Sequence, residues 1–162
     1  MHQRKYVMDL ILDFALSGSK PIATPIELNQ KLTTCELDTH IGDSQGPFLV
    51  DPRLYQRLVS RLLYLTITRP VITFDVQSFS QFVHASKQSH LEAALRVVKY
   101  IKQSPSIRVL MSSSGSNTLQ GFFYVDWGSY FNTRKSIIGY MAKFGDSPIS
   151  WKSKKQPTIF RS

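Results

Sequence analysis

The sequence predicts an α+β protein in which helices precede a small antiparallel sheet. Up to residue 104 the apolar residues recur at helical spacing, and after Pro105 they fall in short β-prone runs separated by polar turns. Helices followed by strands are the order typical of the α+β class. We predict three segments, covering residues 1–50, 51–104 and 105–162.

Composition allows a folded core and excludes several classes of protein. The 162 residues are 42% apolar and 12% aromatic, which argues against global disorder. The single cysteine, Cys35, excludes an internal disulfide, and no apolar run approaches the length of a membrane span. Asp9 and Asp13 interrupt the apolar run near the N-terminus, so we interpret it as a helix and not a signal peptide. We therefore expect an intracellular, non-secreted protein with no membrane or disulfide partner, in a compartment that the sequence leaves open.

The first predicted helix covers Gln3 to Leu16 and stops at Ser17-Gly18. Residues 19–50 then form a long polar connection rich in Pro and Gly. A structureless stretch of this length is unusual inside a compact domain. It either wraps on a surface or is a true linker.

Three helical stretches are predicted in the second segment. Asp51-Pro52 supplies an N-cap acid followed by proline at the first helical position, and Pro70 ends or kinks that helix. A second helical stretch runs from about Val71 to Ser86. The capping box that begins at Ser89 opens a third helix, which continues to about Gln103.

Some polar side chains on these helices invite a functional interpretation. Arg53, Arg57 and Arg61 line one face of the first of the three, where they either form a solvated face or contact phosphates. His84 and His90 are isolated in the sequence, so we interpret them as packing or surface residues and not as metal ligands.

The last segment predicts strands and turns. Its central strand begins at Leu119, alternates in period two and ends at Asp126. A carboxylate at the end of a strand is how a nuclease sheet can present a metal ligand, although an ordinary hairpin with a surface Asp has the same pattern. The other predicted elements are a strand at Arg108–Met111, turns at Ser112–Ser116 and Gly128–Thr133, and strands at Ser136–Tyr140 and Pro148–Lys152.

The positive charge is concentrated in the second half of the chain. Residues 1–81 carry eight basic and eight acidic side chains, whereas residues 82–162 carry twelve basic and three acidic ones, which accounts for the net charge of +9. This asymmetry predicts a surface for a polyanion, unless it is a basic surface with no partner. The candidate nucleic-acid-binding residues are Trp127, Arg134, Lys135, Trp151, Lys152, Lys154 and Lys155.

The motifs of most phosphate, metal and nucleophile chemistry are absent from the sequence. No glycine-rich phosphate loop, His/Cys cluster or Gly-x-Ser-x-Gly elbow occurs. The second half holds only three acids, Glu92, Asp126 and Asp146. Because two-metal nucleases hold their ions with several converging carboxylates, we expect no metal site and no cofactor.

Several motifs in one order resemble the Pol polyprotein of copia-type LTR retrotransposons. The stretch YQRLVSRLLYLTITRP at 55–70 resembles the family's Y-R-x-L-V-G-x-L-x-Y-L-T-x-T-R-P. The stretch SQFVHASKQSHLEAALRVVKYIKQSP at 80–105 resembles the family's S-Q-F-M-x-x-P-x-x-x-H-x-x-A-x-x-R-I-L-R-Y-L-K-G-T-P. TRKSIIGY at 133–140 and ISWKSKKQPTIFRS at 149–162 resemble T-R-R-S-T-S-G-Y and I-S-W-x-S-K-K-Q-x-x-x-x-x-S.

The resemblance implies a place in that polyprotein for each segment. Residues 1–50 look like the end of the reverse transcriptase region, with QRKY at 3–6 and KPIATP at 20–25. Residues 51–104 look like a helical thumb or connection, and residues 105–162 look like a truncated start of the RNase H domain. The parent family uses Mg²⁺ in both activities.

The departures from the family pattern bear on function. The family strand reads G-Y-S-D-A-D-W-A-G-D, where this chain reads GFFYVDWGSY at 121–130. Tyr124 therefore stands at the position of the first catalytic Asp, and Asp126 matches the second. We expect the family's other catalytic acids to lie before Met1 and after Ser162. A phenol in place of a carboxylate removes the anionic oxygen that magnesium prefers.

Three functions follow from these observations. The first is a catalytically inactive remnant of a reverse transcriptase and RNase H polyprotein, without a selected activity. The second is a non-enzymatic basic module that binds an RNA–DNA hybrid or another nucleic acid weakly and without sequence preference. The third is a residual RNase H, which Tyr124 disfavours.

Overall fold

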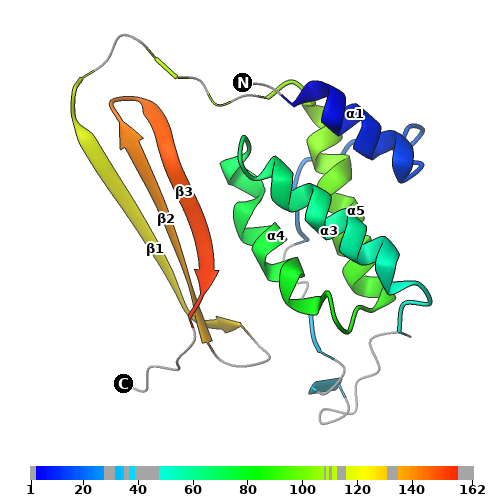
Figure 1. The fold of residues 1–162 in the computed structure, drawn as a ribbon. Helices are drawn as coiled ribbons and strands as arrows, with labels where there is room; N and C mark the ends of the chain where they lie inside the picture. The colour runs from blue at the N-terminus through cyan, green and yellow to red at the C-terminus, as the bar shows by residue number, and fades with distance from the viewer. Residues whose placement is uncertain are drawn as a thin grey trace. The chain divides into compact units, whose positions relative to one another are not determined.

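The computed structural model contains two compact units, residues 1–108 and residues 109–162 (Figure 1). It describes residues 3–27, 32–34, 37–38, 48–107, 109, 111–112, 116–130 and 135–156, without the side chains of residues 126–130 and 135. The first unit is helical and the second is an antiparallel sheet, which confirms the predicted α+β class. Among the described residues no helix is both long and apolar enough to cross a membrane.

Helix α1 (Arg4–Asp13) is shorter than the predicted helix because it ends at Asp13, with Phe14 as the C-cap. The Leu16 N–H donates to the carbonyl of Ile11 and the Ala15 N–H donates to that of Leu12, the hydrogen-bond pattern of a Schellman motif. Ala15 takes the left-handed position of this motif, with φ of 53°. The predicted stop at Ser17-Gly18 is therefore wrong, because Ala15 has already ended the helix.

Lys102 holds the segment that follows α1. Its ammonium donates to the carbonyl oxygens of Leu16, at 2.8 Å, of Ser17 and of Ser19, at 2.7 Å. Lys102 belongs to the last turn of α5 (Gln88–Gln103), so one side chain links the end of α5 to the end of α1.

Helix α3 (Pro52–Leu65) begins where the sequence predicts and supplies the centre of the helical core. The Asp51 carboxylate accepts a hydrogen bond from the Arg53 N–H at 3.0 Å, as an N-cap acid does. The buried stripe of this helix repeats at helical spacing, as predicted, and consists of Tyr55, Leu58, Val59, Leu62 and Leu65. It packs against both α4 (Thr73–Phe79) and α5.

The predicted helix at Val71–Ser86 is in fact three short pieces. A 3₁₀ turn at Pro70–Ile72 precedes α4, and a second 3₁₀ turn at Ser80–Phe82 follows it. The Tyr55 hydroxyl donates to the carbonyl of Phe79 at 2.8 Å, at the point where α4 ends. A carbonyl engaged by a side chain from another helix marks the end of α4, and periodicity could not reveal this contact.

Helix α5 begins one residue before the predicted capping box. The residue at its N-cap is Lys87, and the Lys87 N–H donates to Nδ1 of His90 at 3.2 Å. The predicted role of Ser89 as the capping residue is therefore wrong, because the imidazole of His90 receives the N-cap amide.

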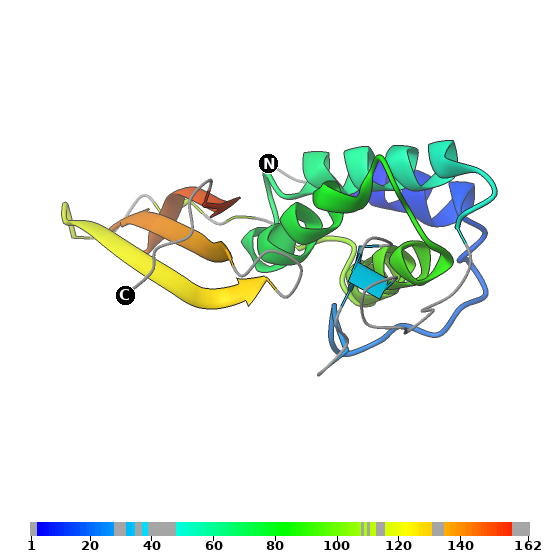
Figure 2. The ribbon, with the colours of Figure 1, turned by 90° about the horizontal axis from the view of Figure 1, so that it is seen from below.

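The described parts of the predicted long connection lie against α5, which favours the wrapped alternative over a linker. The Arg96 guanidinium pairs with Glu27 at 2.8 Å and donates to the Thr24 hydroxyl at 3.2 Å. The Lys87 ammonium pairs with Asp38. In Figure 2 the blue segment after α1 passes α5 on the side away from α3.

The second unit is a three-stranded antiparallel sheet in the order β1-β2-β3 (Figure 1). Its strands are β1 (Leu119–Tyr130), β2 (Lys135–Phe144) and β3 (Ser147–Lys155), which confirms the predicted hairpin and final strand. Strand β1 runs through the start of the predicted turn at Gly128 and Ser129, and residues 131–134 lie outside the described residues. The strand predicted at Arg108–Met111 is not formed at Val109 or Met111, and residues 108 and 110 lie outside the described set.

Candidate nucleic-acid interface

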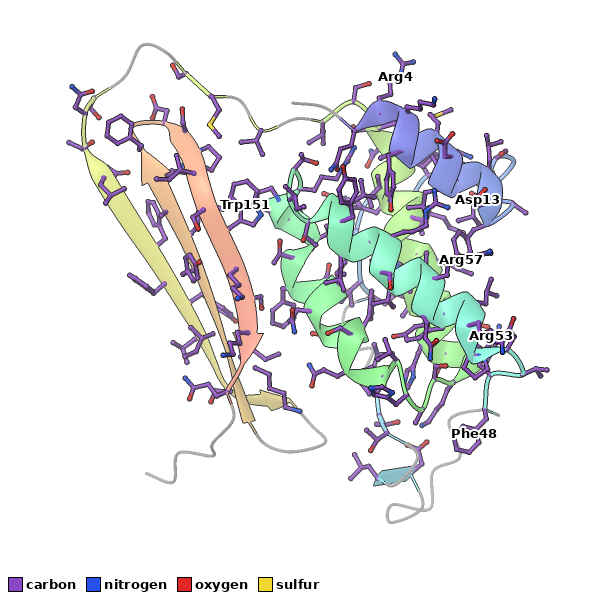
Figure 3. The ribbon with its side chains drawn as sticks, in the orientation of Figure 1. Arg4, Asp13, Phe48, Arg53, Arg57 and Trp151 are labelled. Carbon is purple, nitrogen blue, oxygen red and sulfur yellow. The ribbon has the colours of Figure 1, made fainter. Side chains whose placement is uncertain are left out.

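The predicted nucleic-acid-binding residues are concentrated on β3, at one edge of the sheet. Trp151, which Figure 3 labels on β3, belongs to this strand together with Lys152, Lys154 and Lys155. Trp127 and Lys135 belong to β1 and β2, where the backbone is described and the side chains are not, and Arg134 lies outside the described residues. The described part of the candidate site is therefore built on one strand and its neighbours.

The alternation of β3 divides these residues between the two faces of the sheet. Residues directly opposite each other in an antiparallel pair lie on the same face. Lys152 is opposite Tyr140, which is opposite Phe123. The next row on this face is Val125, Ile138 and Lys154. We call the surface formed by these six residues the Phe123 face.

The other surface of the sheet holds the remaining candidates. Trp151 is opposite Met141, which is opposite Phe122, and Lys155 is opposite Ile137. The Lys143 ammonium on this surface lies 5.7 Å from the centroid of the Phe122 ring. We call it the Phe122 face. Lys152 and Lys154 are thus brought together on one face, and Trp151 and Lys155 lie on the opposite one.

The sequence prediction did not include three exposed aromatic residues of the sheet. Phe122 is 52% exposed, Phe123 is 79% exposed and Tyr140 is 39% exposed. Large exposed aromatics grouped on a small sheet are unusual for a surface without a partner. The signal was present in the run Phe122-Phe123-Tyr124, where consecutive aromatic residues in a strand must occupy both faces.

Tyr124, the residue at the motif position of a catalytic acid, is on the Phe122 face and is 60% exposed. It stands opposite Gly139, so no side chain covers it from the neighbouring strand. Among the described residues no three His, Cys, Asp or Glu side chains come close enough together to hold a metal ion. A phenol in this position does not offer the carboxylate oxygens that magnesium prefers.

Two of the α3 arginines that could have contacted phosphates instead hold α1 in place. Arg61 pairs with Asp13, and its guanidinium lies 5.1 Å from the Tyr6 ring centroid. The Arg57 guanidinium lies 5.5 Å from the centroid of the Phe14 ring. Figure 3 shows Arg57 on α3 and Asp13 on α1, and these two helices lie side by side there and in Figure 2. The predicted solvated face is therefore wrong for Arg61, whose side chain is 18% exposed, whereas Arg57 remains exposed.

A buried polar cluster near the start of α5 is structural. His90 is fully buried, and its Nε2 lies 3.0 Å from the carbonyl oxygen of Thr33. Burial lowers the pKa of His90 to about 4, so the ring is neutral near pH 7. Burial alone would raise the pKa of Asp38, but hydrogen bonds from Lys87 and Thr33 and the positive charge of Lys87 lower it. His90 thus acts as a packing residue.

Asp75, on α4, is a buried carboxyl group. It is 7% exposed, and Oδ2 has no hydrogen-bond partner among the described residues. Burial raises the pKa of Asp75 to about 7. A single carboxyl in this environment destabilises the folded state when it ionises and supplies no metal site.

Comparison with known proteins shows that the chain is similar to one segment of transposon Pol polyproteins. It is 32% identical over its full length to retrovirus-related Pol polyproteins from transposons RE1 and RE2 of Arabidopsis thaliana. It spans only 10% of the length of each of these relatives. It is also 28% identical over its full length to the uncharacterized mitochondrial protein AtMg00810 of Arabidopsis thaliana, of which it covers 63%.

Over its full length, the chain is thus similar to one segment of the Pol polyproteins of copia-type retrotransposons. No family model matches it. No solved structure matches it either.

Proposed function

We propose that the chain is a catalytically inactive remnant of a copia-type Pol polyprotein, without polymerase or RNase H activity. The observation that carries this proposal is that Tyr124 stands where the family strand has its first catalytic Asp. A phenol oxygen does not replace the carboxylate oxygen that magnesium prefers as a ligand.

The positions of the two acids in the sheet unit support this proposal. Asp126 is opposite Ile137, near the start of β2, whereas Asp146 follows the end of β2 at Phe144. Seven residues of extended strand separate these two ends of β2, which corresponds to roughly 20 Å. The two metal ions of a nuclease site lie about 4 Å apart, so Asp126 and Asp146 cannot share one.

We also propose that residues 1–104 derive from the end of the reverse transcriptase region and residues 105–162 from the start of the RNase H domain. The linked sequence motifs support this assignment. The helical unit followed by an antiparallel three-stranded sheet is compatible with it.

An RNase H assay tests the proposed inactivity. Purified protein is incubated with a labelled RNA–DNA hybrid and Mg²⁺, with and without EDTA. We expect no EDTA-sensitive cleavage, and we expect Tyr124→Asp to leave the protein inactive because one added carboxylate cannot hold two divalent ions. Magnesium-dependent cleavage by the unmodified chain would overturn the proposal.

A second candidate function is weak, sequence-independent nucleic-acid binding by the sheet unit. The observation that favours it is charge, since residues 109–162 contain seven Lys and Arg and only two Asp. Release of counterions from nucleic acid makes such binding fall steeply with salt. If affinity for a mixed-sequence duplex were the same at low and high salt, this electrostatic account would fail.

A further inference from the structure

The Phe123 face carries a continuous row of side chains across all three strands. Phe123 on β1, Tyr140 on β2 and Lys152 on β3 are directly opposite one another. Neighbouring strands are about 4.8 Å apart, so the two rings and the lysine occupy adjacent positions. The Tyr140 hydroxyl lies 3.3 Å from the Ser150 hydroxyl on β3, which fixes the position of the ring relative to the lysine-bearing strand.

Gly121 gives the Phe123 ring room to lie along the sheet. A Cβ atom placed on Gly121 would come within 3.3 Å of Cε2 of Phe123, so the ring leans over the glycine backbone. With 79% of Phe123 exposed, a flat aromatic surface is open to solvent. Every nucleobase has a π-face that can stack on such a ring.

The charge of the same face is complementary to phosphate. Lys152 and Lys154 are both exposed and lie next to each other on this surface, one residue apart along β3. Among the described side chains of the three strands, no acidic residue shares the Phe123 face with them. Two lysines beside two exposed aromatic rings are the residue types that bind unpaired nucleotides.

We propose that the Phe123 face binds single-stranded nucleic acid, with bases stacked on Phe123 and Tyr140 and phosphates contacted by Lys152 and Lys154. This inference rests on the second proposed function and narrows it to one face and one form of nucleic acid. In a duplex the bases are already stacked on each other, so the aromatic rings add affinity only for unpaired bases.

Fluorescence anisotropy of the full chain with a labelled mixed-sequence oligonucleotide of about 12 nucleotides tests the proposal. We expect the single strand to bind more tightly than a duplex of the same length. Phe123→Ala and Tyr140→Ala should each raise the Kd for the single strand by about fivefold or more, and Tyr140→Phe should leave it within about twofold. Phe122→Ala, on the opposite face of the same strand, is the matched control and should also stay within about twofold.

An abasic oligonucleotide of the same length separates stacking from charge. Its Kd should not respond to Phe123→Ala, because it has no base to stack. The double variant Lys152→Gln/Lys154→Gln should reduce the slope of log K against log salt by about 1.4, since each phosphate contact contributes about 0.7 for single strands. The charge-matched control Arg4→Gln/Lys5→Gln, in the helical unit, should leave that slope unchanged.

The outcomes distinguish this inference from the proposal on which it rests. Absence of binding to any nucleic acid at low salt would overturn both. Salt-dependent binding that responds equally to Phe123→Ala and Phe122→Ala would overturn the assigned face alone. Sedimentation of each variant tests a second copy of the chain as the occupant, and a dimer that Phe123→Ala dissociates without changing affinity would overturn the inference. Thermal melting of every variant confirms that it is folded.

Discussion

The helical unit and the sheet unit of this chain treat their apolar side chains in opposite ways. Residues such as Tyr55, Leu58 and Phe79 are fully buried in the helical unit. Among the described strand residues, Ile137 alone is a buried apolar residue, and Phe122, Phe123 and Tyr124 of β1 are exposed on the two faces of the sheet. The comparison teaches that hydrophobic composition alone does not produce a core, because a sheet needs a layer packed on its face to bury the alternating side chains.

Hydrogen exchange should show the largest difference between the two units. The amides of α3 and α5 are protected from exchange because they are hydrogen-bonded within helices whose inner faces are buried. Strand β1, in contrast, has one hydrogen-bonded neighbour and exposed side chains. We expect the slowest amides of residues 55–103 to exchange at least about 100-fold more slowly than those of residues 118–152. Exchange at equal rates, measured by mass spectrometry at peptide resolution, would show that the sheet is as stable as the core.

Alanine substitutions of one large apolar residue in each unit should lower the free energy of unfolding by different amounts. Leu58→Ala removes a fully buried side chain and should destabilise the helical unit by about 2–5 kcal/mol. Phe123→Ala removes a ring that is 79% exposed and should cost about 1 kcal/mol or less. Urea unfolding followed by circular dichroism measures both, and similar losses would contradict the assignment of Phe123 to the surface.

Acid should destabilise the helical unit through His90. Its pKa is lowered to about 4 in the folded state, whereas an unfolded histidine titrates near 6.5. The unfolded state therefore binds the proton first, and stability is lost as the pH falls from about 6.5 to about 4. We expect a loss on the order of 2–3 kcal/mol across this range. His90→Gln should abolish this dependence in urea titrations at several pH values.

Asp75 should act with the opposite sign in an overlapping range. Its pKa is raised to about 7 in the folded state, so the folded protein holds the proton more tightly than the unfolded chain does. The contribution of Asp75 to stability is full below about pH 4 and is lost as the pH rises through 7. Asp75→Asn should therefore stabilise the protein at pH 8, by about 2 kcal/mol, and not at pH 4. A variant that is less stable at both pH values would show that the carboxylate has a partner.

The smallest expected effect concerns the end of α1. Ala15 has φ of 53°, a conformation that costs an L-residue about 1 kcal/mol and that glycine adopts freely. Ala15→Gly should raise the free energy of unfolding of the helical unit by about 0.5 kcal/mol, after the greater entropy of glycine in the unfolded state is subtracted. Phe14→Gly, one residue earlier with φ of −101°, is the control and should not stabilise.

Local signals in the sequence predicted the elements that are stabilised by their own residues. Asp51-Pro52 fixes the start of α3 because the Asp51 carboxylate accepts a hydrogen bond from an N–H only two residues later. The apolar stripe that follows is visible as a helical period. The hairpin was predicted because alternation and turn residues are also local.

The features that the sequence did not reveal depend on residues far apart in the chain. His90 caps its own helix only because the carbonyl of Thr33, 57 residues earlier, holds the other side of its ring. Arg61 leaves the solvent because α1 brings Asp13 to it across 48 residues. For the candidate site, the sequence identified the lysines of β3, but which residues of β2 lie opposite them depends on strand register.

The hold of Lys102 on three carbonyls after α1 has a consequence for the order in which the chain can fold during synthesis. These contacts span 83 to 86 residues, and Lys102 lies in the final turn of the last helix of its unit. Chains emerge from the ribosome N-terminus first. Helix α1 is the first helix of its unit, so nearly all of the helical unit must be synthesised before the C-terminal end of α1 acquires this partner. The contacts between Lys102 and the end of α1 are therefore among the last that the helical unit can form during synthesis.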